Sequence, residues 1–248
     1  MPDGPSAGDG HEQAQLGLFG GWLLEWAGRR TELPSAAKRL IAYVALNGGA
    51  NRSVVAGTLW PEVSEPHANG SLRSTLWRVN KLRPRLIRDL GGVLSLDDNV
   101  HVDVREFSAA ARRIINVDSR AEALPPWADR GGELLPGWYD DWVVFERERL
   151  RQLRLHALEA LAAALCDRGR HAEALDAALD AVGCEPLRES AHHTIVRIHL
   201  AEGNAVEALR AYRACRQLLA AELRLPPSPA LRRLLLDAGV STALVDHD

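Results

Sequence analysis

The sequence predicts an α+β winged helix-turn-helix domain with an N-terminal β-sheet, followed by an all-α, TPR-like helical domain. Short apolar segments separated by glycines come first, and three helical patterns and then strand patterns follow them. Beyond residue 107 the apolar spacing is almost wholly helical. Within that half, Gly169–Leu175 recurs as Gly203–Leu209, an offset of 34 residues. This is the period of tetratricopeptide helix pairs, which bind partners and seldom catalyse.

The expected elements of the first half alternate between strands and helices. Small strands are predicted within Leu16–Leu33, broken at Gly20-Gly21 and Ala27-Gly28. A helix begins at Pro34-Ser35 and stops at Gly48-Gly49. The second helix is expected from Asn51 to Leu59, and the third from about Ala68 to Arg83. Strands are then expected at Leu86–Ile87, Val93–Leu96 and Val100–Val104, with Asp89–Gly92 as a turn.

The domain boundaries follow from these patterns. Residues 1–14 are Gly- and Asp-rich and are predicted to be a disordered tail. Residues 15–106 are assigned to the winged helix and 107–245 to the helical domain. In the second half a long helix is expected over about 139–168. Further helices are expected near 171–183, 188–202, 205–222 and 228–238.

Composition and motif content exclude several classes of function. Of the 248 residues, 46% are hydrophobic and 25% charged, which is typical of a globular protein. The cysteines at 166, 184 and 215 have no paired spacing, so neither a disulfide framework nor a zinc site is expected. No membrane span or signal pattern is apparent, which predicts a cytoplasmic protein. Phosphate-loop, metalloprotease and hydrolase motifs are missing, so we expect no enzyme, no cofactor and no metal.

A basic segment lies in the third helix, within a protein of net charge -3. Between His67 and Arg88 there are cations and no carboxylate, which indicates one basic face. If Leu72, Leu76, Val79 and Leu82 face the core, the opposite side can enter a DNA major groove. A solvated helix face is the plainer alternative. Trp77 could contact a sugar or a thymine methyl group, or could pack on the domain's own sheet.

The predicted DNA contacts combine base-reading and phosphate-binding side chains. Arginine suits guanine and asparagine suits adenine, while helix N-termini and turns bind phosphates. Arg52 and Ser53 begin the second helix, and Arg88 lies near the hairpin turn. The full predicted set is Arg52, Ser53, Arg73, Ser74, Thr75, Trp77, Arg78, Asn80, Lys81, Arg85 and Arg88.

A family resemblance rests on several segments in order. Ser71–Leu82 resembles the recognition helix of SARP-type activators, an actinobacterial group with an OmpR-like winged helix. Leu59-Trp60-Pro61 and Val102–Phe107 are similar to further segments of that family. The second half resembles the bacterial transcriptional activator domain. Its matching segments are Glu133–Trp142, Glu146–Leu150, Glu185–Glu189, Ala211–Arg213 and Glu222–Leu231.

The resemblance implies a transcriptional activator that binds tandem repeats in double-stranded promoter DNA. It also implies a homodimer on DNA and contact with RNA polymerase. Glu62 and Glu65 make the loop before the third helix acidic, so we expect this loop to contact polymerase rather than phosphate. Arg224 stands where the family usually has glycine, which puts the local turn in question. The sequence does not identify a regulatory signal, and whether a small-molecule effector controls the protein is left open.

Other interpretations concern the helical half. The chain could instead be a TPR-like scaffold whose first domain binds protein rather than DNA. Glu189 and His192 have a di-iron spacing, but only one such motif is evident, so both are expected to be ordinary helix residues. The aromatic set Trp138, Tyr139, Trp142 and Phe145 is expected at the domain junction. That set, or Leu150, Leu153, Leu158 and Leu161, could form an apolar surface through which two copies of the protein dimerise. Packing in the core of a single copy explains these residues equally well.

Overall fold

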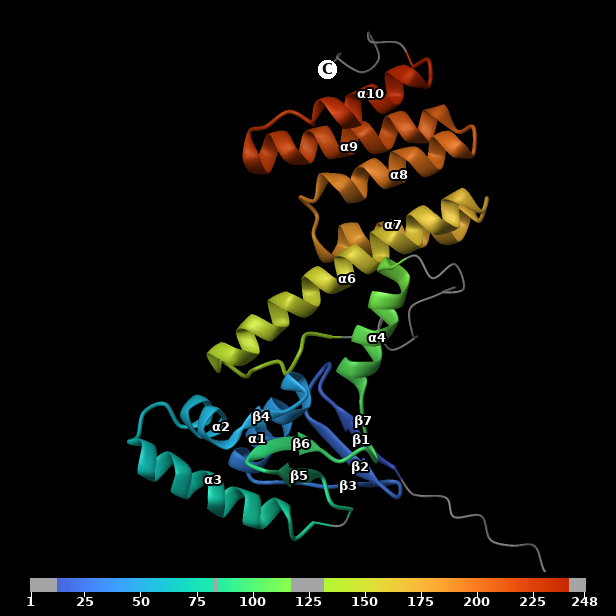
Figure 1. Ribbon diagram of the computed structural model, residues 1–248. Coiled ribbons are helices and arrows are strands. Elements are labelled where there is room, and N and C mark those ends of the chain that lie inside the picture. Colours follow the sequence, from blue (N-terminus) through green and yellow to red (C-terminus); the bar gives the residue numbers. More distant parts are fainter. Residues whose placement is uncertain (1–12, 83, 117–131, 241–248) are drawn as a thin grey trace, which may run out of the picture. The chain divides into compact units, whose positions relative to one another are not determined.

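The computed structural model describes residues 13–82, 84–116 and 132–240, and Figure 1 shows their helices and strands. The chain forms two compact units, one from 1–108 with 126–147 and one from 109–125 with 148–248. The first contains two small sheets and three helices, and the described part of the second is helical. The predicted fold class, α+β followed by all-α, is confirmed. The predicted tail lies outside the described residues as far as residue 12.

The N-terminal sheet has four strands in the order β3-β2-β1-β7. These are β1 (Ala14–Gly17), β2 (Leu23–Trp26), β3 (Arg29–Arg30) and β7 (Val100–Val102). Ala14, assigned to the tail, instead begins β1 and is fully buried. The segment expected as a strand over Val100–Val104 ends early, because β7 pairs in parallel with β1 and Asp103 begins helix α4 (Asp103–Ile115). The Asp103 carboxylate accepts hydrogen bonds from the Leu18 and Phe19 N–H groups and so joins α4 to the sheet.

Three helices follow this sheet as predicted. They are α1 (Ser35–Asn47), α2 (Arg52–Leu59) and α3 (Glu65–Val79). Helix α1 ends at Gly48, whose φ of 70° favours glycine. Arg105 of α4 donates hydrogen bonds to the Val44 and Ala45 carbonyls, which lie in the last turn of α1 and have no partner within the helix. Helix α3 packs on both α1 and α2.

The wing is a second sheet in the order β4-β6-β5. It contains β4 (Ala50–Asn51), β5 (Ile87–Leu90) and β6 (Val93–Leu96). Gly91 and Gly92 form the two-residue loop between β5 and β6, with φ values of 63° and 89°. Positive φ at both loop positions gives the twist that a tight hairpin requires, and glycine adopts it without strain. The predicted turn at Asp89–Gly92 is therefore confirmed.

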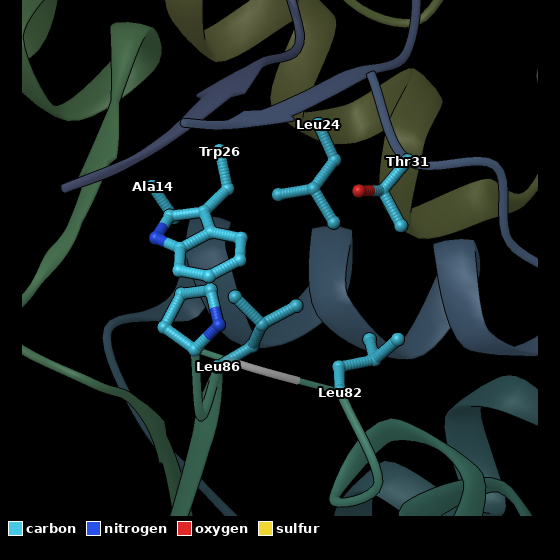
Figure 2. A pocket seen from close by; sticks show the side chains of 7 residues that line it. Ala14, Leu24, Trp26, Thr31, Leu82 and Leu86 are labelled. Atoms are coloured by element: carbon cyan, nitrogen blue, oxygen red, sulfur yellow. The ribbon is translucent and has the colours of Figure 1, made fainter. Parts of the chain in front are cut away.

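Apolar side chains fix the segment that leaves α3. Figure 2 shows Leu82 and Leu86 facing Ala14, Leu24 and Trp26 of the N-terminal sheet. The space between these side chains is about 20 Å³, room for about one water molecule. The pocket therefore leaves little room between the end of α3 and the sheet. Contacts among the apolar side chains around it hold the end of α3 against the sheet.

Residues 132–147 pack with the first unit, which differs from the predicted boundary at 107. The Leu135 N–H donates to the Leu18 carbonyl at 2.9 Å, and the Gly20 N–H donates to the Glu133 carbonyl at 3.0 Å. Trp138 stacks on Trp22 with ring centroids 6.4 Å apart. The aromatic set thus belongs partly to the core of the first unit. Trp142 and Phe145 lie in the first turns of α6 (Asp141–Asp167), a helix that begins in the first unit and continues in the second.

The helical unit continues with α7 (His171–Cys184), α8 (Glu189–Ala201), α9 (Ala205–Leu223) and α10 (Pro229–Asp237). The repeat marks equivalent positions in two helix pairs, α6–α7 and α8–α9. Gly169 and Gly203 follow the first helix of each pair, with φ of 74° and 78°. Ala174 and Ala208 are both fully buried in the second helix, where a small side chain lets neighbouring helices approach closely. The predicted helix-pair repeat is confirmed.

Candidate nucleic-acid interface

The inner face of α3 is apolar and forms part of the core. Ala68, Leu72, Leu76 and Val79 recur at spacings of three and four, and all four are buried. Pro66 occupies the first turn, where a missing N–H has no consequence for helix hydrogen bonding. The helix runs from Glu65 to Val79 rather than from Ala68 to Arg83. Leu82 lies in the turn that follows and lines the pocket of Figure 2.

The outer face of α3 carries most of the predicted base-reading side chains. Arg73, Ser74 and Arg78 are exposed on the helix, and Asn80 and Lys81 are exposed directly after it. In the part of the chain that the structure describes, no carboxylate pairs with Arg73 or Arg78. Arg83 lies outside the described residues. A helix with one apolar face and one exposed face of donors has the form that a major groove admits.

Trp77 is exposed on this face rather than packed against the sheet. Its exposed fraction is 61%, and the Lys81 ammonium lies 3.3 Å from the centre of its ring. A cation over an indole face is attracted by the negative face of the ring. This contact fixes the two side chains relative to one another. The two residues are four positions apart, the spacing at which side chains meet on a helix.

Thr75 is the predicted contact that α3 turns inward. Its exposed fraction is 5%, and its hydroxyl donates to the Ser71 carbonyl at 2.8 Å. A buried hydroxyl with its proton committed has no reach to a base edge. Thr75 is therefore a core residue of the helix. The residue lies on the boundary between the two faces, and its burial does not favour the predicted contact with DNA.

The wing cations have carboxylate partners, unlike those of α3. Arg52 pairs with Asp89 at 2.5 Å. Arg88 pairs with Asp97 at 2.9 Å and with Asp98 at 2.5 Å. The hydrogen bonds that the Arg88 guanidinium donates to these two carboxylates raise the pKa of Arg88, and Arg88 in turn lowers the pKa of Asp97. Much of the positive charge of the wing is thus balanced within the protein.

The remaining predicted residues are accessible. Ser53 is exposed in the first turn of α2, and Arg85 is exposed although its Nε donates to the Ile87 carbonyl. Glu62 and Glu65, assigned to polymerase, are both exposed; Glu62 lies in the loop before α3, and Glu65 is the first residue of α3. Val63 lies between them and is 47% exposed, so this loop has an acidic and apolar surface. Sequence reasoning did not single out Val63, although its place between two glutamates was visible.

In the helical unit, Glu185–Glu189 joins three elements. Glu185 pairs with Arg151 of α6 at 2.5 Å, and Arg188 makes two hydrogen bonds of 2.8 and 2.9 Å to Glu159. The Glu189 carboxylate accepts the Ser228 N–H at 3.0 Å, next to the start of α10. The segment between α7 and α8 therefore holds α6 and α10. These side chains of the family-like segment are therefore engaged in contacts within the protein.

The residues considered for a metal site have other partners. Glu189 bonds to the backbone at Ser228, and His192 is buried with Nε2 2.8 Å from the Pro186 carbonyl. Burial raises the pKa of the Cys215 thiol to about 11, which keeps it protonated and unreactive at neutral pH. Among the described residues, no helix is long and apolar enough to cross a membrane.

Comparison with known proteins supplies the family. The model of the bacterial transcriptional activator domain matches residues 102–236, more than half of the chain. The chain belongs to this family. The match begins at the end of β7 and continues through α10, so it includes the segment that joins α6, α8 and α10.

Two curated relatives of this family member are also regulators, and they confirm the resemblance to SARP-type activators. The regulatory protein AfsR of Streptomyces coelicolor is 30% identical over 214 residues, 79% of this chain and 21% of the relative. AfsR of Streptomyces griseus is 26% identical over 253 residues, 94% of this chain and 25% of the relative. The chain thus spans about a quarter or less of these relatives. Both are named regulatory proteins, in agreement with a function other than catalysis.

A solved structure supports the same architecture. EmbR of Mycobacterium tuberculosis, determined in complex with a low affinity phosphopeptide, aligns with a TM-score of 0.69 at 20% identity. The alignment covers 92% of this chain and 65% of EmbR. At this identity the likeness concerns the fold. The alignment includes both the winged-helix part and the helical part of this chain.

Proposed function

We propose that this protein is a cytoplasmic, sequence-specific DNA-binding transcriptional activator in which α3 enters the major groove of promoter DNA. The observation that carries the proposal is the outer face of α3. There Arg73 and Arg78 are exposed and have no carboxylate partner among the described residues, while the opposite face is buried. A scaffold that binds protein through its first domain has no need of such unopposed cations.

The proposed roles follow from side-chain chemistry. Arg78 and Arg73 are the candidates for bidentate contacts with guanine, and Asn80 is the candidate for adenine. Ser74 and Lys81 are placed for phosphate or base contacts, and Ser53 and Arg85 for phosphate. Trp77 offers an apolar surface for a sugar or a thymine methyl group. Arg52 is available to phosphate once its ion pair with Asp89 opens.

Recruitment of RNA polymerase is proposed for the loop before α3. Glu62 and Glu65 repel DNA phosphates, whereas their combination with exposed Val63 suits a protein surface. Substituting both glutamates with glutamine should reduce transcription from a target promoter and leave DNA affinity unchanged or slightly higher. Equal loss of DNA affinity and transcription would reject this role.

Binding of two copies to tandem repeats is the second part of the proposal. Leu150, Leu158 and Leu161 are buried in the protein's own core, and Trp142 packs edge-on against Tyr43 with centroids 5.3 Å apart. Of the surfaces considered for pairing, exposed Tyr139 and Phe145 therefore remain available. A linked pair of DNA-binding units makes the second contact intramolecular, which raises affinity by about 10²–10⁴.

The deciding experiment is selection of bound duplexes from a random DNA pool, followed by binding to one and to two tandem copies of the selected site. The full chain is compared with residues 1–147, because a fragment ending at 106 would lack Trp138 and Trp142 of the first unit. Enrichment of a sequence, and a large advantage for the full chain on tandem sites only, are expected. If no sequence is enriched, the DNA-binding function is wrong. Equal affinity of both proteins for tandem sites would instead reject only the proposed pairing of two copies on DNA.

A further inference from the structure

The contact between the wing and α2 centres on one carboxylate, that of Asp89. Its Oδ1 accepts the Gly92 N–H at 3.0 Å, which closes the β5–β6 turn. Its Oδ2 accepts a hydrogen bond of 2.5 Å from the Arg52 guanidinium. The Arg52 backbone N–H also donates to the Gly92 carbonyl at 2.9 Å. The first residue of α2 is therefore joined to the wing turn by both its backbone and its side chain.

The ion pair is accessible to solvent. The side chains of Arg52 and Asp89 are each 35% exposed. Ion pairs with this exposure contribute little to stability. A carboxylate presents oxygens to a guanidinium much as a phosphate does. A DNA phosphate, whose binding also releases a condensed counterion, is thus able to replace Asp89.

Resting on the proposed function, we propose that Asp89 is a positioning residue that occupies Arg52 in the free protein and is exchanged for a DNA phosphate on binding. It holds Arg52 at the wing and reduces the affinity that this cation contributes to random DNA. Because non-specific binding is essentially electrostatic, such a pair lowers background binding without touching a base. The residue acts through Arg52 and does not itself contact DNA.

Arg88 provides the contrast within the same wing. Its Nε contacts Asp97, whose side chain is only 15% exposed, and its Nη2 contacts Asp98, which is 84% exposed. Asp97 also accepts the Asn99 N–H at 3.2 Å. Loss of Asp98 leaves Arg88 still paired with Asp97. Arg88 therefore holds β5 to the turn after β6, and we assign it no phosphate.

This contrast supplies a matched pair of variants. Asp89→Asn and Asp98→Asn each remove one negative charge from the wing. The Asp89→Asn side chain retains an oxygen that accepts the Gly92 N–H, so the turn is kept, and Asp89→Ser offers a second way to keep that acceptor. Only the changes at residue 89 release a cation. Thermal unfolding of each variant verifies the fold before binding is measured.

The experiment is titration of the full-length variants with a random-sequence duplex over a range of salt concentrations. Asp89→Asn and Asp89→Ser are expected to bind about 3-fold more tightly at low salt, with the slope of log K against log salt steeper by about 0.9. Asp98→Asn is expected to gain less than about 2-fold. In an Arg52→Gln background the gain from Asp89→Asn should disappear. With Arg52 present, Asp89→Glu should bind as the wild type does.

Several results would overturn the inference. Equal gains from Asp89→Asn and Asp98→Asn, or a gain that persists without Arg52, would mean that only general charge repulsion was relieved. Salt-dependent binding by the wild type with no effect of Asp89→Asn would reject the role of Asp89 and leave the proposed function intact. Salt-independent binding by the wild type would reject both.

Discussion

Arg78 on α3 and Arg188 before α8 are the same residue type in opposite surroundings. Arg188 forms two hydrogen bonds to Glu159 and connects the α7–α8 segment to α6. Arg78 is exposed and, within the described residues, has no carboxylate partner. In the helical unit arginine stabilises the protein, whereas on α3 its donors remain available to another molecule. This difference in pairing supports the proposed DNA contact on α3 more strongly than the number of basic residues does.

The largest effect expected from this comparison is on stability. Arg188→Ala should lower the free energy of unfolding by about 2 kcal/mol, because it leaves the partly buried Glu159 carboxylate without its charged donor. The matched Arg78→Ala should change it by less than about 0.5 kcal/mol, as surface substitutions do. Urea unfolding of both variants measures this. Equal losses would show that Arg78 also has a structural role.

The pH dependence of stability sharpens the same comparison. Burial raises the pKa of Glu159, but hydrogen bonds from Arg188 and Ser190 bring it to a net value below the usual 4.5. Its contribution is therefore present above pH 4.5 and is lost as the pH falls through the lower, folded-state pKa. The stability difference between wild type and Arg188→Ala should accordingly shrink below pH 4.5. A difference that stays constant as the pH falls to about 3 would contradict the ion pair.

On DNA the expected order reverses, and Arg78 becomes the sensitive residue. Arg78→Ala should reduce discrimination between the selected site and random DNA by about 1–3 kcal/mol, the value of a bidentate contact with guanine. Lys81→Ala should weaken both duplexes alike, because a lysine after the helix end suits a phosphate. Competition titrations with the two duplexes give both quantities. If the two variants lose affinity equally for both duplexes, these roles are wrong.

Arg224, at the end of α9, is expected to have the smallest effect on the free energy of unfolding. Arg224 ends α9 with φ 57° and ψ 33°, so the turn questioned from the sequence does form, in a left-handed conformation. That conformation strains any residue with a Cβ atom. Arg224→Gly should therefore raise the free energy of unfolding by about 0.5–1 kcal/mol. Gly203→Ala is the opposite control and should lower it by a similar amount, since Gly203 has φ 78°. Destabilisation by Arg224→Gly would show an unrecognised contact of the side chain.

Local features of the sequence predicted most of these elements. Gly169 and Gly203 marked helix ends, and the spacing of Leu72, Leu76 and Val79 identified the buried face of α3. What failed depends on residues far apart in the chain. The pairing of β7 with β1 and the bond from Leu135 to Leu18 join segments whose own patterns carry no sign of the contact.

The candidate site shows the same division. The exposed positions of Arg73 and Arg78 follow from helical period alone. The pairing of Arg52 with Asp89 depends on a hairpin that brings residues 37 positions apart together. The burial of Thr75 could not be predicted, because the helical period leaves the boundary between the two faces uncertain by about one position.

The salt dependence of DNA affinity tests the central claim most directly. The full chain is titrated with a selected duplex at several salt concentrations. If the exposed cations of α3 and its flanks displace counterions at about four phosphates, log K should fall against log salt with a slope near -3.6. A flat response would mean that these cations do not meet phosphates, and it would contradict the assignment of α3 to DNA.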